Sequence, residues 1–130
     1  MAIYAEHEPI VYFLKAGKEV KIGTTTNLNN RAREIQNSVF PVRVELLGVV
    51  DGGRSIEKAI HQEFRQANTW GEWFWCCATI KTFITTYAYL PVWWKEINKD
   101  WAKLEKRYRD NQASFNARFP EWVLRRTGST

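Results

Sequence analysis

The chain has 130 residues, of which 19 are basic and 14 acidic, so its net charge at neutral pH is +5. Hydrophobic residues make up 45% of the sequence, which excludes a disordered protein, and the length predicts one compact domain. Seven Trp, seven Phe and five Tyr residues bury enough area for a small core that needs neither a disulfide nor a structural metal.

The basic excess lies in the second part of the chain. Residues 1–75 carry nine Lys or Arg and nine Asp or Glu, whereas residues 76–130 carry ten and five. Such a basic extension is typical of proteins that bind a polyanion such as nucleic acid, and it is equally typical of a solubilising helix.

Cys76 and Cys77 are the only cysteines, and they are adjacent. Neighbouring cysteines form a poor disulfide, so we expect a reducing compartment and no disulfide-linked partner. Residues 1–6 lack the pattern of a signal peptide, and no apolar run approaches the ~20 residues of a membrane span. We therefore expect an intracellular, cytoplasmic protein with no membrane partner.

The first predicted element is a β-hairpin. Residues 10–15, IVYFLK, are β-branched and aromatic and follow Pro9, which is typical of a strand. Residues 16–18 form a short turn. Residues 19–23, EVKIG, alternate between polar and apolar and predict the returning strand.

A helix and a third strand are predicted next. Four apolar residues at spacings of four, three and four share one helical face: Leu28, Ala32, Ile35 and Val39. Pro41 ends this helix. Residues 43–51, RVELLGVVD, form the most strand-like run of the chain.

The remaining elements are predicted to be mostly helical. A second helix spans residues 56 to about 68, residues 70–72 form a turn, and residues 73–75 are extended. Residues 77–90 fit a helix or a strand, and the spacing of their apolar residues favours a helix. A long helix is predicted for residues 92–119, with one apolar face that consists of Ile97, Trp101, Leu104 and Tyr108.

This order predicts an α+β fold in which helices flank a small three-stranded antiparallel sheet. Residues 1–76 form the core. Residues 77–130 form a helical, aromatic-rich, basic extension that either packs on the core or contacts DNA.

Candidate chemical groups lie on the first two strands and on both helices of the core. Tyr12 is on the first strand, Lys21 near the end of the second, and Arg31 one turn into the first helix. Glu57 and His61 are four residues apart and share a face of the second helix. Taken singly, each has a purely structural explanation, such as a strand aromatic, a solvated charge or a local hydrogen bond.

Together these residues resemble the motifs of the GIY-YIG nuclease superfamily, in particular its T5orf172 or MUG113 branch, over about residues 10–76. Val11-Tyr12-Phe13 stands in place of the first tyrosine motif and Lys21-Ile22-Gly23 in place of the second. Arg31 follows Gly23 at the spacing found in the family's first helix.

Two further motifs extend the resemblance. The run from Glu57 to His61, with Phe64 beyond it, resembles the family's E-x-x-x-H-x-x-F helix, and residues 71–74 resemble the branch's GEWF signature. In these motifs four residues have a structural role: Gly23, Gly71, Trp73 and Phe74. Glu72 is either a turn residue or a functional one.

The resemblance implies hydrolysis of phosphodiester bonds in DNA with one Mg²⁺ or Mn²⁺ ion. Glu57 would bind the metal, and Arg31 would hold the scissile phosphate through its fork of donors. Tyr12 would orient or deprotonate the attacking water. Lys21 would steady the phosphate or lower the pKa of Tyr12. His61 would move a proton, orient water or only hold Glu57.

The extension interleaves aromatic and basic residues. Its aromatics would stack on unpaired bases or pack into a core, and the regular spacing within residues 97–108 favours packing. Its cations would neutralise phosphates. The candidate nucleic-acid contacts, with one from the core, are Arg33, Lys95, Lys99, Lys103, Lys106, Arg107, Arg125 and Arg126.

Two functions follow. The first is a metal-dependent endonuclease or nickase of phage or mobile-element type, which would need a homodimer or two encounters to cut both strands. The second is a catalytically weak or inactive module that binds nucleic acid or a protein, supported by Val11 and Phe13 in the first motif and by a missing asparagine. The retained set favours the enzyme, and it consists of Tyr12, Lys21, Arg31 and Glu57.

Overall fold

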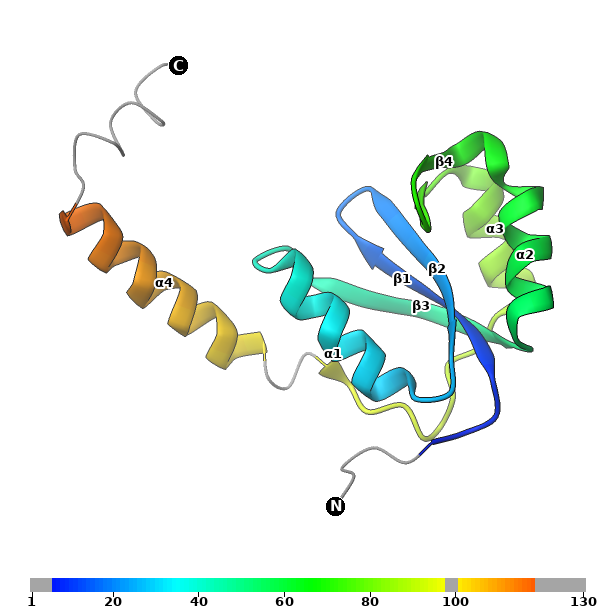
Figure 1. Ribbon diagram of the computed structural model, residues 1–130, viewed down its shortest axis with the longest axis horizontal. Coiled ribbons are helices and arrows are strands. Elements are labelled where there is room, and N and C mark those ends of the chain that lie inside the picture. The colour runs from blue at the N-terminus through cyan, green and yellow to red at the C-terminus, as the bar shows by residue number, and fades with distance from the viewer. Residues whose placement is uncertain (1–5, 98–100, 119–130) are drawn as a thin grey trace. The chain divides into compact units, whose positions relative to one another are not determined.

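The computed structural model describes residues 6–97 and 101–118 (Figure 1). The chain divides into two compact units, Met1–Ile97 and Asn98–Thr130. The first unit contains the strands β1 (Ile10–Ala16), β2 (Glu19–Thr25), β3 (Val44–Asp51), β4 (Asn68–Trp70) and β5 (Trp73–Trp75), and the helices α1 (Leu28–Val39), α2 (Arg54–Glu63) and α3 (Ala78–Tyr87). The second contains α4 (Trp101–Arg118).

The sheet has five antiparallel strands in the order β3-β1-β2-β5-β4. The fold class is therefore α+β as predicted, but the prediction of three strands was wrong. The additional strands, β4 and β5, form a short edge hairpin that pairs with β2. Residues 73–75 were expected to be extended, whereas β4 was missed because all three of its side chains are exposed and show no apolar pattern.

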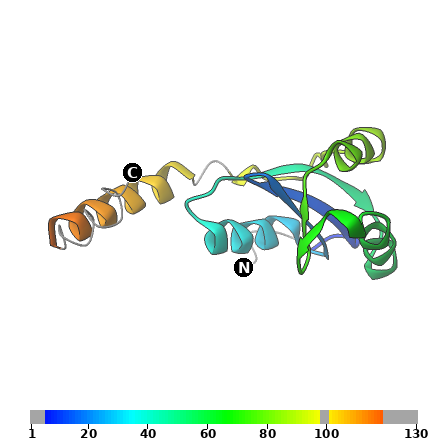
Figure 2. The same cartoon turned by 90° about the horizontal axis from the view of Figure 1, so that it is seen from above.

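Strand alternation gives the sheet two apolar faces. Val11, Phe13 and Ile22 face the side covered by α2 and α3, where they form one core cluster with Ile60 and Ile80. The other cluster joins the alternate strand residues to α1 and consists of Ile10, Tyr12, Leu14, Leu28, Ala32, Ile35, Val44, Leu46 and Val49. Figure 2 shows α1 on one side of the sheet and α3 on the other.

The predicted helix over residues 77–90 is confirmed as α3. Its buried residues Ile80 and Ile84 belong to the core cluster beside α2, so α3 is part of the first unit. The sequence had grouped α3 with the extension that begins at residue 77.

The long helix predicted from residue 92 begins only at Trp101 within the described residues. The segment before it is irregular: Trp93 stacks on His7 at 4.1 Å between ring centroids, and the backbone N–H of Lys95 donates to Asn29 Oδ1 at 2.7 Å. Ile97 packs against the cluster beside α1. The backbone N–H of Lys95 is therefore bonded to a side chain and not to a carbonyl of a helix, and the Trp93 ring is held against His7. No helix among the described residues has the length and apolar character to cross a bilayer.

Candidate functional site

The first residues of the predicted site lie opposite each other on the paired strands β1 and β2. Tyr12 is 1% exposed and lies opposite Gly23 in the strand register. A Cβ atom on Gly23 would lie 2.4 Å from the Tyr12 hydroxyl oxygen, far closer than carbon and oxygen can approach. The missing side chain of Gly23 therefore makes the space that the phenol occupies.

Glu72 reaches the same position from the turn between β4 and β5. Its Oε2 atom would lie 2.9 Å from the same Cβ on Gly23. The structure thus brings Glu72 beside Tyr12, a role that the sequence left open. The resemblance to the GEWF signature was the only sequence signal for this residue.

The hairpin that carries Glu72 is shaped by the rest of that signature. Gly71 has φ +56, a left-handed conformation that favours glycine in the tight turn. The Asn68 side-chain amide donates to the carbonyl oxygens of Gly71 and Trp73, at 2.8 and 3.0 Å. Phe74 is buried in the core cluster beside α2 and anchors β5. Gly71 thus shapes the turn of the hairpin, and Phe74 fixes it to the core.

Arg31 approaches Tyr12 from α1. The Asn27 side chain caps this helix by accepting from the backbone N–H of Asn30, and buried Leu28 and Ala32 hold the helix on the sheet. Arg31 Nε donates to the Tyr12 hydroxyl at 3.4 Å. This hydrogen bond raises the pKa of Arg31, which therefore stays cationic.

Lys21 adds a second cation on the same face. Its Nζ atom lies 3.9 Å from Glu72 Oε2 and 5.3 Å from the centroid of a Trp73 ring. Burial lowers the pKa of Lys21, Glu72 acts in the opposite direction, and the positive charge of Arg31 lowers it further. The site therefore contains two cations of which one, Lys21, is held between a carboxylate and an aromatic ring.

Tyr12 is a neutral phenol at neutral pH. Burial raises its pKa above the ordinary value of 10.0, and the Arg31 hydrogen bond and charge only partly oppose this effect. The negative charges of Glu72 and Glu57 raise the pKa of Tyr12 further. Of the two roles expected for Tyr12, this environment favours orienting water over deprotonating it.

His61 has a structural partner. Its Nε2 atom lies 2.7 Å from the Ile22 carbonyl oxygen and donates to it, and its ring packs against Phe74 at 4.9 Å. The same Ile22 residue donates its backbone N–H to the Glu72 carbonyl oxygen at 3.0 Å. Of the three roles considered for His61, this contact supports holding α2, and with it Glu57, against β2.

Glu57 lies in the first turn of α2 and is half-buried. Within residues 6–97 and 101–118, no group of three His, Cys, Asp or Glu side chains could enclose a metal ion. The carboxylates of Glu57 and Glu72, whose charges both act on Tyr12, nevertheless fit a hard cation such as Mg²⁺, which takes one or two carboxylates and fills its other positions with water and phosphate oxygens. Glu57 and Glu72 are the groups that would hold it.

The candidate nucleic-acid contacts are more dispersed. Arg33 lies on α1, and Lys95 is tied to α1 by its backbone. Lys103, Lys106 and Arg107 are exposed on α4, where Lys106 forms an ion pair with Asp110 at 2.9 Å. Three of the predicted contacts lie outside the described residues: Lys99, Arg125 and Arg126.

Because Tyr12 is buried, the stability of the folded state depends on pH in the alkaline range. The folded pKa of Tyr12 is raised, so the folded state binds more protons than the unfolded state above pH 10, and stability falls as the pH rises through this range. The loss is at most about 1.4 kcal/mol per pH unit. The lowered pKa of Lys21 has the opposite effect, because it makes stability rise with pH below the ordinary value of 10.5. Lys21 is present both in the native protein and in the variant compared with it below.

Urea unfolding of the native protein and of Tyr12→Phe at pH 9 and pH 11 measures this effect. We expect the native protein to lose more stability over that interval than the variant. An equal loss in both proteins would show that the hydroxyl of Tyr12 is not shielded from solvent.

Comparison with known proteins gives one finding. A family model described as the T5orf172 domain matches residues 9–102, a range that includes every strand, α1 to α3 and all of the residues gathered around Tyr12. No curated protein and no solved structure matches the chain.

Proposed function

The chain belongs to the T5orf172 domain family, within the GIY-YIG-like nuclease-related group, and we propose that it is a metal-dependent endonuclease that hydrolyses phosphodiester bonds in DNA. The observation that carries this proposal is the convergence at Gly23. There a phenol and a carboxylate from two separate elements meet over a position that has no side chain, and a guanidinium from a third element donates to the phenol.

Each side chain has a part in the proposed reaction. Arg31 binds two oxygens of the scissile phosphate, and its rigid fork holds the phosphate in line with the attacking water. Lys21 adds charge as the negative charge on phosphate oxygens grows. The neutral Tyr12 hydroxyl orients the water, which attacks phosphorus and releases its proton to solvent as the bond to the leaving oxygen breaks. Glu57 and Glu72 would hold the divalent cation, which would stabilise the leaving oxygen when it is bound.

The proposal also states where the protein acts and how many chains take part in cleavage. The substrate is DNA, the expected location is the cytoplasm, and one site per chain cuts one strand in each encounter. Cutting of both strands at one locus therefore requires a homodimer or a second encounter. Measurement of the mass in solution distinguishes these two routes.

The direct test is cleavage of supercoiled plasmid by purified protein in EDTA, Mg²⁺ or Mn²⁺. We expect nicked circles with either metal, few linear products at early times, and no cleavage in EDTA, because the two carboxylates alone offer no group that stabilises the leaving oxygen. Cleavage in EDTA equal to that in Mg²⁺ would contradict a metal-dependent mechanism.

One observation favours a binding module as the second candidate. Among the described residues Tyr12 donates to no base and instead accepts from Arg31, so the charged face can hold a phosphate without cutting it. In addition, α4 carries five basic and two acidic residues. A plasmid band that is retarded but uncut with every metal would support this candidate.

A further inference from the structure

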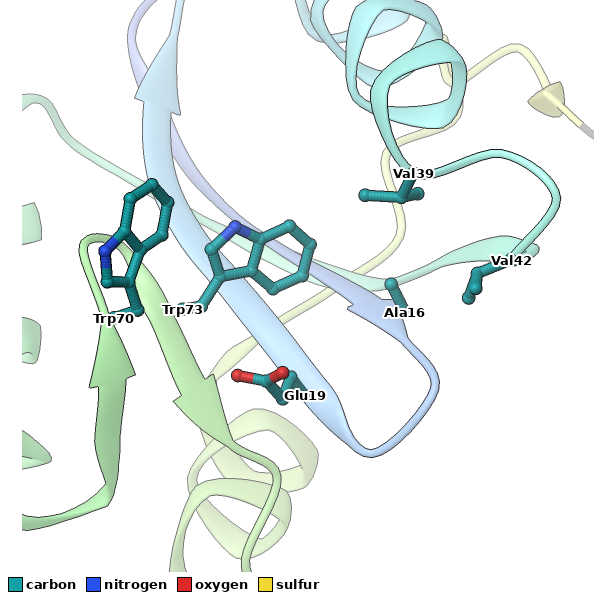
Figure 3. A pocket seen from close by; sticks show the side chains of 6 residues that line it. All are labelled: Ala16, Glu19, Val39, Val42, Trp70 and Trp73. Carbon is teal, nitrogen blue, oxygen red and sulfur yellow. The ribbon is translucent and has the colours of Figure 1, made fainter. Parts of the chain in front are cut away.

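A pocket of about 260 Å³ opens on the face of the sheet that α1 covers (Figure 3). It is lined by Ala16, Glu19, Val39, Val42, Trp70 and Trp73, and we name it the Trp pocket. We propose that the Trp pocket binds one unpaired nucleobase of the DNA strand that is cut at Tyr12 and Arg31. This inference rests on the proposed function and extends it to the recognition of the substrate.

The pocket presents an aromatic surface to solvent. Trp70 lies on the edge strand β4 and is 77% exposed, so most of its indole surface is available. In Figure 3 the Trp73 ring lies between Trp70 and the apolar side chains of Val39 and Ala16. Nucleobases stack on such rings whatever their sequence, because every base has a π face.

The pocket and the proposed catalytic site lie along the same face of β2. Glu19, Lys21 and Gly23 are alternate residues of that strand and therefore share one face. Lys21 lies opposite Trp73 in the register, with its ammonium 5.3 Å from the Trp73 ring centroid. A cation suited to a backbone phosphate thus stands between the pocket and the residues that meet over Gly23.

The spacing along β2 suits a DNA strand. The four residue steps from Glu19 to Gly23 span about 13 Å of strand. A stacked DNA strand advances 3.4 Å for each nucleotide, so this interval corresponds to about four nucleotides at most. A strand with one phosphate at Arg31 can therefore place a nearby base in the Trp pocket while an intervening phosphate meets Lys21.

The carboxylate of Glu19 determines which chemical groups can occupy the pocket. Glu19 is oriented by the Thr69 hydroxyl, which donates to its carboxylate. A carboxylate at this position repels phosphate, so the occupant is a base and not the backbone. Carboxylates accept from the exocyclic amino groups of cytosine and adenine, whereas thymine offers none. The pocket therefore favours cytosine or adenine over thymine.

The test measures binding of short single-stranded oligo(dC) and oligo(dT) in EDTA, where no cleavage occurs. We expect Trp70→Ala to weaken oligo(dC) binding about 5- to 150-fold with an unchanged salt dependence, since no phosphate contact is lost. Trp70→Phe keeps a π face and should restore most of the affinity. Glu19→Gln should bring the affinities for oligo(dC) and oligo(dT) closer together.

Trp75→Ala is the matched control, because Trp75 is half-exposed on the neighbouring strand β5 and does not line the pocket. Equal losses in Trp70→Ala and Trp75→Ala, or no loss in either, would overturn the inference. So would a Trp70→Ala change that alters the mass in solution, since the pocket would then hold a second copy of the chain. If plasmid is cut normally by Trp70→Ala and oligonucleotide affinity is unchanged, only the pocket fails and the nuclease proposal stands.

Discussion

Replacing Glu57 by Gln is expected to reduce metal-dependent plasmid cleavage at least about 100-fold while leaving DNA binding nearly unchanged. The substitution keeps the size of the side chain and the helix, but it removes the carboxylate in the first turn of α2, whose charge raises the pKa of Tyr12. Initial rates of nicking, measured at several Mn²⁺ and Mg²⁺ concentrations, give the loss and show whether added metal compensates for it.

The matched control is Glu63→Gln, an exposed position on the same helix. It should retain the native rate, because Glu63 is not among the residues that influence Tyr12. Cleavage at the native rate by Glu57→Gln would contradict the assignment of Glu57 to the metal.

Arg31→Lys tests the phosphate contact at the same site. Lysine keeps the charge but not the planar fork of donors, so cleavage should again fall about 100-fold. Arg33→Lys lies two residues away on α1 and provides the comparison. Native rates in both Arg31→Lys and Glu57→Gln would require another site in the chain.

Gly23→Ala is expected to reduce cleavage about 100-fold in a protein that still folds. The added Cβ would lie 2.4 Å from the Tyr12 hydroxyl oxygen and 2.9 Å from Glu72 Oε2, so both groups must move. A displacement of about 1 Å in a catalytic group is enough for a loss of this size. Overpacking should also lower the free energy of unfolding by roughly 1–3 kcal/mol.

Gly17→Ala separates this displacement from ordinary strain. Gly17 has φ +64 and no atom within 4 Å of a Cβ built on it, so alanine there costs about 1 kcal/mol without touching the site. Its cleavage rate should stay native. In a double-mutant cycle, Tyr12→Phe should recover part of the stability lost in Gly23→Ala, since the phenol oxygen makes the closest contact. Independent effects of the two changes would contradict the proposed close approach.

Much of the fold could be predicted from apolar periodicity. The strands β1 to β3 and the helices α1 to α3 were found because each buries one regular face. The exposed strand β4 shows no such pattern, and its pairing depends on β5. Residues 92–97 are aromatic and charged at helical spacing, but contacts with His7 and Asn29 hold them in an irregular conformation.

The candidate site could be predicted only through motifs. Tyr12, Lys21 and Arg31 lie together because strand register and helix packing bring distant segments into contact, which no local pattern reveals. The position of Glu72 depends on a glycine on another strand, and the role of His61 depends on a carbonyl group that the strand ladder leaves available. Such interactions follow from tertiary structure alone.

The Ile22 peptide has a consequence for how the site tolerates change. Its N–H is bonded to the segment that carries Glu72, and its carbonyl to the helix that carries Glu57. The segments that carry Glu57 and Glu72 are therefore both bonded to the Ile22 peptide, although 15 positions separate these residues in the sequence. A substitution that weakens either hydrogen bond changes the distance between the two carboxylates. His61 and the β4–β5 turn are therefore constrained together. A substitution at one of them is best accommodated by a compensating substitution at the other.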